Sequence, residues 1–334
     1  MSDEEAFAGA VDVHAHYFPP DYLRAARARM DDPGVPPDAT GFMTTYEPLD
    51  RDPAFTGAVE ERIGLMDAAG ISIQVLSYSA GNVWHPDAAV RSDLVSRFND
   101  GCAEVVQMRP DRFRLFANMP MPFVDRAIAE TGRARDLPGF VGVSICTHSA
   151  GIPIDDPRWD PLYELWNESK TVVFVHPDGF CAPTVLGGHF LGWALGAVFD
   201  DTIAAVRLMT SGVVERFPDI TWIIPHCGGA LPFLLERIDR VWHSYRHLLA
   251  DASRPHVTVK RLLVDSAVPS PETLRFTHDT LGPEALLFGT DFPFANRNDL
   301  SAARDVLVES GIASDGVAQV LYGNARGWLG AGVV

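Results

Sequence analysis

Eight short apolar runs, separated by segments with helical periodicity, constrain the fold of this chain more than any other feature. Most of the runs are continuously hydrophobic, which is typical of parallel strands buried on both faces. The predicted strands are residues 10–13, 71–77, 112–117, 140–146, 171–175, 220–225, 261–264 and 286–290. Helical patterns lie between them, for example at 58–69, 87–108, 161–169, 200–216 and 231–249. This alternation predicts an α/β fold, a (β/α)8 TIM barrel.

The chain is longer than a minimal barrel requires. Its 334 residues exceed a core of roughly 250 residues, so we expect a single domain over residues 1–334 with insertions after strands 1 and 5. The first insertion, residues 17–56, is rich in Pro, Asp and Gly, and little regular structure is expected there. The second, residues 177–199, is rich in Gly and aromatic residues. Both emerge on the face where barrel enzymes carry their active sites. One possible role of these insertions is structural, as a cap on the barrel or a contact with a second subunit. The other is to form the wall of a substrate pocket, and the two roles are compatible.

The charge balance excludes several classes of partner. The chain has 27 Lys and Arg against 44 Asp and Glu, a net charge of -17, and no basic cluster. This charge repels nucleic acid and anionic membrane surfaces, so neither is an expected partner. The longest apolar stretch, residues 190–199, is interrupted by two glycines and is shorter than the roughly 20 residues of a membrane helix. The acidic first residues do not resemble a signal peptide, so we expect a cytoplasmic protein.

Histidine and aspartate side chains stand at the ends of four predicted strands. His14 and His16 follow the first strand two residues apart, a spacing that places both imidazoles on one face of an extended chain and lets them converge on one ion. Three later strands also end in a potential ligand or acid/base group, at His176, His226 and Asp291. Because the carboxyl ends of barrel strands meet at one mouth, these groups predict a metal site there.

The donor types indicate which ion such a site would bind. Three imidazoles and one carboxylate suit one divalent ion, Zn²⁺ or Mn²⁺, and leave coordination positions open for water or substrate. Open positions are typical of catalytic sites, whereas a closed structural zinc site would use several cysteines close in sequence. The four cysteines form no Cys-x-x-Cys pair, so neither a disulfide framework nor a thiolate site is expected. They are Cys102, Cys146, Cys181 and Cys227.

Motifs around these groups follow the order found in a known family. The motifs are His14-Ala15-His16, Val175-His176-Pro177, Phe217-Pro218-Asp219 leading to His226-Cys227-Gly228-Gly229-Ala230-Leu231-Pro232, and Gly289-Thr290-Asp291-Phe292-Pro293. Together they resemble the amidohydrolase superfamily (amidohydrolase-related family 2). Within it they resemble the branch that contains aminocarboxymuconate-semialdehyde decarboxylase and the ortho-hydroxybenzoate decarboxylases acting on γ-resorcylate and 6-methylsalicylate. The resemblance spans nearly the whole chain.

The resemblance implies a role for each of the five groups. His14, His16, His176 and Asp291 would be the metal ligands, and His226 would be the unliganded acid/base residue beside them. Asp291 is a second candidate for delivering the proton.

The lysines independently support a single ion. Binuclear amidohydrolases commonly bridge two ions with a carbamylated Lys at the end of the fourth strand. The only lysines of this chain, Lys170 and Lys260, lie just before strands. A lysine bridge cannot be built at the end of the fourth strand.

Candidate substrate contacts lie close to the predicted ligands. Phe292 and Phe294, directly after Asp291, are expected to face the pocket, and His189 in the second insertion is a further candidate. Arg51 and Arg62 are candidates to hold a second substrate anion, although surface salt bridges or helix solvation are the expected use of both. The remaining histidines are expected to be packed or surface residues. They are His85, His148, His243, His247, His256 and His278.

The resemblance also implies an activity. The expected reaction is metal-dependent, non-oxidative decarboxylation of a small aromatic, ortho-hydroxybenzoate-like, or dienoic carboxylic acid, by a homodimer or higher homo-oligomer. A hydrolase or hydratase of a small carbonyl or carboxylate compound is the alternative, because a bound metal can also activate water. A non-catalytic binding barrel is disfavoured, because the whole candidate ligand set and His226 are present.

Overall fold

Eight parallel strands form the centre of the molecule, in the order β1-β2-β3-β4-β7-β8-β9-β10. The computed structural model describes residues 9–35, 56, 59–79, 85–177, 186–248, 253–267, 270–295 and 299–329. The strands are β1 (Ala10–His16), β2 (Ile71–Ser77), β3 (Phe113–Asn118), β4 (Phe140–Cys146), β7 (Val172–His176), β8 (Thr221–Ile224), β9 (Leu262–Asp265) and β10 (Leu286–Leu287). A separate two-stranded sheet joins β5 (His148–Ser149) to β6 (Ile152–Pro153). The predicted (β/α)8 barrel is confirmed.

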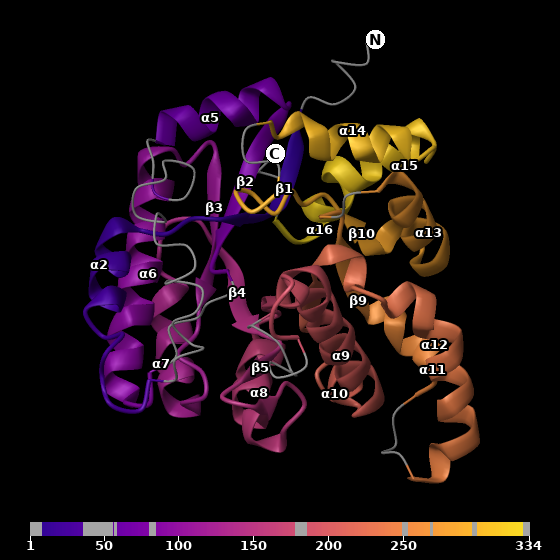
Figure 1. The fold of residues 1–334 in the computed structure, drawn as a ribbon, viewed down its shortest axis with the longest axis horizontal. Coiled ribbons are helices and arrows are strands. Elements are labelled where there is room, and N and C mark those ends of the chain that lie inside the picture. The colour runs from indigo at the N-terminus through magenta and orange to yellow at the C-terminus, as the bar shows by residue number, and fades with distance from the viewer. Residues whose placement is uncertain are drawn as a thin grey trace.

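Backbone hydrogen bonds close the barrel between its first and last strands. The amide of Val13 donates to the carbonyl of Phe288 at 3.0 Å, and the amide of Asp291 donates to the carbonyl of His14 at 2.8 Å. A parallel bridge pairs Ala15 with Phe292. In Figure 1 the indigo strand β1 accordingly lies beside the yellow C-terminal elements. Closure joins the first and last strands of the described sheet, and it brings the carboxyl end of β1 beside the segment that follows β10 at the barrel mouth.

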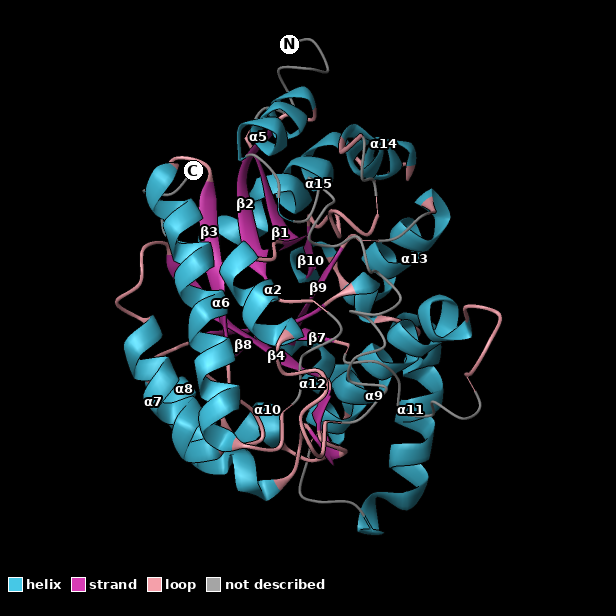
Figure 2. Cartoon of the chain, turned by 60° about the vertical axis from the view of Figure 1, so that its left-hand side comes forward, coloured by secondary structure: helices cyan, strands magenta, loops and turns pink. Residues whose placement is uncertain are grey.

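Helices surround the strands (Figure 2). The longer helices are α2 (Pro20–Arg27), α5 (Val59–Ala68), α6 (Ala88–Met108), α7 (Val124–Ala134), α8 (Asp160–Glu168), α9 (Ala197–Thr210), α11 (Leu231–Tyr245), α13 (Pro271–Leu281) and α14 (Ser301–Glu309). The shorter ones are α10 (Val213–Arg216), α12 (Pro255–Thr258), α15 (Ser314–Ala318) and α16 (Asn324–Leu329). Among the described helices, none combines the length and apolar character that a membrane crossing requires.

Several predicted boundaries were wrong. The first strand continues to His16, so both histidines lie inside it, and the last strand pairs only over Leu286–Leu287. The helix predicted over 200–216 begins earlier, at Ala197, and is divided by Gly212, whose φ of 79° no right-handed helix accommodates. The helix predicted over 231–249 ends at Tyr245 and continues as a short 3₁₀ turn.

The first insertion also contains more regular structure than predicted. Helix α2 begins directly after Pro19, with Pro20 in its first turn, where a missing amide proton costs nothing. This helix packs against α6, and Gly101 of α6 permits the close approach, because a Cβ at this position would lie 2.3 Å from the Pro19 Cβ. Residues 36–55 of the insertion lie outside the described residues.

A bulge in β1 determines which of its side chains face the barrel interior. Val11 and Val13 belong to the apolar cluster that fills the barrel, together with Phe174 of β7. Strict alternation would then turn His14 outward. The pairing register with β2 shifts by one residue between Asp12 and Ala15, however, and the His14 ring lies 5.0 Å from the Phe174 ring. An extra residue in one strand reverses the facing of every later side chain. Both histidines of the pair therefore point inward.

Beneath the histidines, the barrel is filled by aliphatic and aromatic side chains. Phe116 of β3 stacks on Phe174, with ring centroids 5.6 Å apart and planes inclined by 6°. On its other side Phe116 stacks on Trp328 of the C-terminal helix α16, at 5.9 Å. This apolar layer supports the Phe174 ring, on which His14 rests.

Replacement of Phe116 by Ala is expected to lower the free energy of unfolding by about 3–5 kcal/mol, because it removes a fully buried ring and leaves a cavity. The matched control is Phe233→Ala, at a side chain that is 77% exposed, where a change within about 0.5 kcal/mol is expected. Urea denaturation followed by circular dichroism measures both values. Equal effects of the two substitutions would show that Phe116 does not support the barrel interior.

Candidate metal centre

Four side chains converge at the carboxyl ends of β1, β7 and β10. They are His14, His16, His176 and Asp291, and each offers one ligand atom within 4.8 Å of the ligand atoms of the others. The Nε2 atoms of His14 and His16 lie 3.0 Å apart, and Asp291 Oδ1 lies 3.3 and 3.2 Å from them. The ring of His176 completes the group, with its centroid 4.8 Å from the His16 ring.

The second nitrogen of each imidazole is occupied by a partner of its own. His14 Nδ1 lies 2.8 Å from Asp265 Oδ2, and His176 Nδ1 lies 3.0 Å from the carbonyl oxygen of Pro177. His16 Nδ1 lies 3.2 Å from the hydroxyl of Ser77, which itself donates to the carbonyl of Ala15. These acceptors place the ring protons on Nδ1 and leave each Nε2 lone pair directed at the common point. Ring orientation by such partners is typical of metal-binding histidines.

Burial favours the metal-binding form of two of the histidines. Burial lowers the pKa of His16 to about 4 and the pKa of His176 well below its usual value. Both rings are therefore neutral at pH 7, the form that binds a metal. Burial would also lower the pKa of His14, but the carboxylates of Asp265 and Asp291 outweigh it and raise this pKa to about 9. The negative charge that attracts a proton to His14 would equally attract a divalent cation.

A buried carboxylate, Asp12, ties the two ligand-bearing segments together. Asp12 accepts hydrogen bonds from the hydroxyl and the amide of Thr290, at 2.7 and 3.0 Å, and from the amide of His14, at 3.1 Å. The side chain of Gln74 donates a further hydrogen bond at 2.9 Å. Burial raises the pKa of Asp12 to about 6, although these donors oppose the shift. Asp12 thus fixes the backbone of both segments that carry the ligand group, by which we mean His14, His16, His176 and Asp291.

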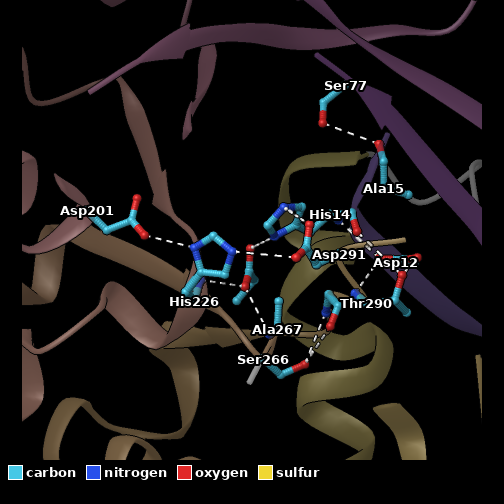
Figure 3. A network of polar contacts seen from close by, with 12 residues as sticks. Asp12, His14, Ala15, Ser77, Asp201, His226, Ser266, Ala267, Thr290 and Asp291 are labelled. Atoms are coloured by element: carbon cyan, nitrogen blue, oxygen red, sulfur yellow. Dashed lines mark hydrogen bonds and ion pairs between the residues drawn. The ribbon is translucent and has the colours of Figure 1, made fainter. Parts of the chain in front are cut away.

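His226 lies between Asp291 and Asp201, and the carboxylate of Asp201 holds its ring (Figure 3). Its Nδ1 lies 2.8 Å from Asp201 Oδ2, while its Nε2 lies 3.8 Å from Asp291 Oδ2. Burial would lower the pKa of His226, but these two carboxylates outweigh it and hold the pKa well above its usual value. Burial also raises the pKa of Asp201 to about 7. This arrangement fixes the ring of His226 with Nε2 directed toward Asp291.

Helix α9 comes close enough to hold His226 because of Gly229. A Cβ at Gly229 would lie 2.2 Å from the carbonyl oxygen of Val198 and 2.5 Å from the Thr202 hydroxyl, which accepts a hydrogen bond from the amide of Ala230 at 2.8 Å. His226 and Asp291 both have positive φ, 52° and 55°. Such strained backbone is concentrated at functional sites.

Asp201 and Asp265 were missed by the sequence analysis. Asp265 uses one oxygen for His14 and the other for the amide of His226, at 3.0 Å. Asp265 directly follows the apolar run 261–264, as the other candidate residues follow their strands. The same pattern could therefore have predicted it as a site residue. Asp201 lies on α9 rather than at a strand end, and no motif marks it.

A cavity of about 750 Å³ opens at the convergent groups. His176, His226 and Asp291 line its inner end, and Phe294 lines it as expected. The Phe294 ring lies 5.4 Å from the His16 ring and 5.9 Å from the Trp193 ring. The other described lining residues are Ser79, Pro177, Trp193, Ala194, Ala197, Val198, Gly229, Ser266, Ala267, Thr273, Gly289, Thr290, Ala295, Ala302, Ala303 and Val306.

The structure places three of the candidate residues outside the described lining of this cavity. Phe292 is 1% exposed and packs beneath Arg62, whose guanidinium lies 4.6 Å from its ring, so it does not face the pocket. Arg62 is itself buried and donates to the carbonyl of His16, so it makes no surface salt bridge. His189 is exposed and absent from the described cavity lining. Arg51 lies outside the described residues.

The lysines lie where the sequence analysis placed them. Lys170 and Lys260 precede β7 and β9, at the ends opposite the barrel mouth, and β4 ends at Cys146. Neither lysine can bridge a second ion at the end of β4.

A protein-family model described as amidohydrolase matches residues 11–331. A gamma-resorcylate decarboxylase of Rhodococcus jostii (strain RHA1) is 30% identical over 263 residues, which cover 71% of this chain and 78% of that protein. A 2-amino-3-carboxymuconate-6-semialdehyde decarboxylase of Dictyostelium discoideum is 29% identical over 238 residues. That match covers 70% of this chain and 66% of the relative, slightly less than two thirds of its length.

A solved structure of a decarboxylase shares the fold of this chain. A dihydroxybenzoic acid decarboxylase from Polaromonas sp. JS666, with bound manganese and the inhibitor 2-nitroresorcinol, superposes with a TM-score of 0.81 at 25% identity. The superposition covers 96% of this chain and 97% of that one. Since the family model spans nearly all of the sequence and the barrel carries its convergent groups at the expected strand ends, this chain belongs to the amidohydrolase family.

Proposed function

We propose that this protein is a metal-dependent, non-oxidative decarboxylase of a small aromatic carboxylic acid of the ortho-hydroxybenzoate type, or of a related dienoic acid. The observation that carries the proposal is the geometry of the barrel mouth. Four ligand atoms within 4.8 Å of one another adjoin His226, which is held by Asp201, at the inner end of a cavity. The relatives described above are decarboxylases of such acids.

One divalent ion, Mn²⁺ or Zn²⁺, fits the donor set. In the proposal His14, His16, His176 and Asp291 hold it, since three imidazole nitrogens and a carboxylate oxygen suit either ion. The manganese bound in the Polaromonas structure favours Mn²⁺. When bound, the ion would act as a Lewis acid that orients the substrate carboxylate and the neighbouring oxygen.

The side chains around the cavity would supply the proton that decarboxylation needs. Direct loss of CO₂ leaves an electron pair on a ring carbon, whereas protonation of that carbon first allows the C–C bond to break as the arene is restored. His226 presents Nε2 while Asp201 fixes Nδ1, and Asp291 Oδ2 lies 3.8 Å from His226 Nε2. His226 and Asp291 are therefore the proposed catalytic residues, and Asp201 is a positioning residue.

The cavity walls suit a flat ring. Phe294 and Trp193 pack against each other with their planes inclined by 32°, and together they form an aromatic wall that begins at His16. Hydrolysis or hydration on the same scaffold would use the same polar groups to activate water. No residue of the described cavity lining favours hydrolysis over decarboxylation, and the relatives described above are all decarboxylases.

The proposal is tested with manganese-loaded protein and a panel of ortho-hydroxybenzoates, with CO₂ release and metal content measured on the same samples. Wild-type protein is expected to release CO₂ without an added redox cofactor. His226→Asn should retain about one ion per chain and lose about 10²-fold or more in kcat, the range of a general acid/base contribution. His176→Ala should lose the ion itself. Full turnover by His226→Asn, or cleavage of esters with the carboxylate retained, would contradict the proposal.

A homodimer or higher homo-oligomer is part of the proposal. Exposed apolar side chains between residues 190 and 203 support it, because patches of this kind are typical of subunit contacts. They are Phe190, Trp193, Leu195, Phe199 and Ile203.

Sedimentation equilibrium tests this part of the proposal. A dimer is expected for the wild type, and Phe199→Asp should shift the population toward monomer by placing a charge in the contact. A wild-type protein that stays monomeric at all concentrations would contradict it.

A cytoplasmic location is also proposed. The buried thiols of Cys102 and Cys227, which are outside any disulfide, support it.

A further inference from the structure

We propose that the substrate carries one uncharged, apolar substituent, an alkyl or aryl group, on the ring that bears its carboxylate. This inference rests on the proposed function and narrows its substrate class. It comes from a part of the cavity that we call the apolar arm, which is lined by Ala194, Ala197, Ala302, Ala303 and Val306.

The apolar arm is continuous with the candidate metal centre. His176, His226 and Asp291 line the same cavity of about 750 Å³ as the arm residues. The arm itself is built by elements outside the barrel strands. Ala194 and Ala197 belong to the π-helical segment Gly192–Gly196 and the start of α9, and the other three residues belong to α14. The cavity therefore extends from the barrel mouth outward to these two helices.

The volume exceeds what a single substituted ring occupies. A carboxylate, its neighbouring hydroxyl and one benzene ring would take up the polar inner end, next to Thr290 and Ser266. Cavities of this size are typical of considerably larger ligands. Four of the five arm residues are alanines, whose methyl groups leave the remaining space open rather than filling it.

The chemistry of the lining selects an uncharged group for that space. Among the described lining residues, the ionisable side chains are Asp291, His176 and His226, all at the inner end, and none is Lys or Arg. A second substrate carboxylate in the arm would lose its hydration without gaining a cationic partner among the described lining residues. An alkyl or aryl group there instead gains the free energy of leaving water, about fourfold in affinity for each buried methylene.

The aromatic wall directs a substituent into the arm. The wall begins at the His16 ring, continues through Phe294 and ends at Trp193, which directly precedes the arm residue Ala194. A substrate ring that lies along this wall with its carboxylate at the inner end points its far side toward α9 and α14. Trp193 is 36% exposed, so the wall also borders the opening of the cavity.

The experiment uses phenols, which resemble the decarboxylated product and bind without turnover. Isothermal titration calorimetry on manganese-loaded protein would compare phenol with 3-methyl-, 3-propyl- and 3-pentylphenol and with the matching 4-alkyl series. In the wild type, affinity is expected to rise by about fourfold per added methylene in at least one series until the arm is filled.

Two substitutions on α14 locate the effect. Ala302→Phe fills the arm and should abolish the rise of affinity with chain length. Val308→Phe adds the same ring at a side chain on this helix that is 43% exposed and is not among the described lining residues, so it should keep the wild-type series. The proposal is overturned if wild-type affinity is flat or falls with chain length, if no phenol binds, or if Ala302→Phe keeps the wild-type rise.

CO₂ release from unsubstituted 2-hydroxybenzoate and its alkyl derivatives separates this inference from the proposed function. If no acid releases CO₂ while phenol affinity still rises with chain length, the proposed decarboxylase activity is refuted and binding of an apolar group in the arm is retained. If CO₂ is released but phenol affinity does not change with chain length, binding in the arm is refuted and the decarboxylase activity is retained.

Discussion

The hydrogen-bonded join between the end of β1 and the segment after β10 is the contact on which the site depends. The amide of Asp291 donates to the carbonyl of His14, and the amide of His16 donates to the carbonyl of Phe292 at 2.7 Å. The same join closes the barrel and brings Asp291 to the two histidines, which precede it by 275 residues or more. Asp12 reinforces it by accepting hydrogen bonds from both segments. Barrel closure and assembly of the ligand group are thus one structural event.

Carboxylates behind the ligand group connect it to the proposed proton donor. Asp265 holds the ring of His14 with one oxygen and the backbone of His226 with the other. Displacement of the Asp265 side chain would therefore misplace both His14, a candidate ligand, and His226, the proposed acid/base residue. Partners of this kind keep a site within the narrow geometry that catalysis needs. Asp201, on α9, fixes the orientation of the His226 ring through its contact with Nδ1.

The sequence predicted the barrel and the group of candidate ligands because both follow from repeated local patterns. Apolar runs mark buried strands, and polar residues at their ends mark the mouth. The bulge before His14 could not be predicted, because it depends on the register with β2. Asp201 is on a helix and becomes adjacent to His226 only through the close approach at Gly229. The burial of Phe292 and Arg62 could not be predicted from the sequence either. Their stacking depends on a tertiary contact, the join between β1 and the segment after β10.

The most direct test of the account is an anomalous-scattering map of crystals of manganese- or zinc-loaded protein, measured at the absorption edge of the ion. The account predicts one peak per chain at about 2.0–2.2 Å from the Nε2 atoms of His14, His16 and His176 and from a carboxylate oxygen of Asp291, with His226 outside bonding distance. An empty mouth in metal-replete protein, or a peak bound by other residues, would contradict it.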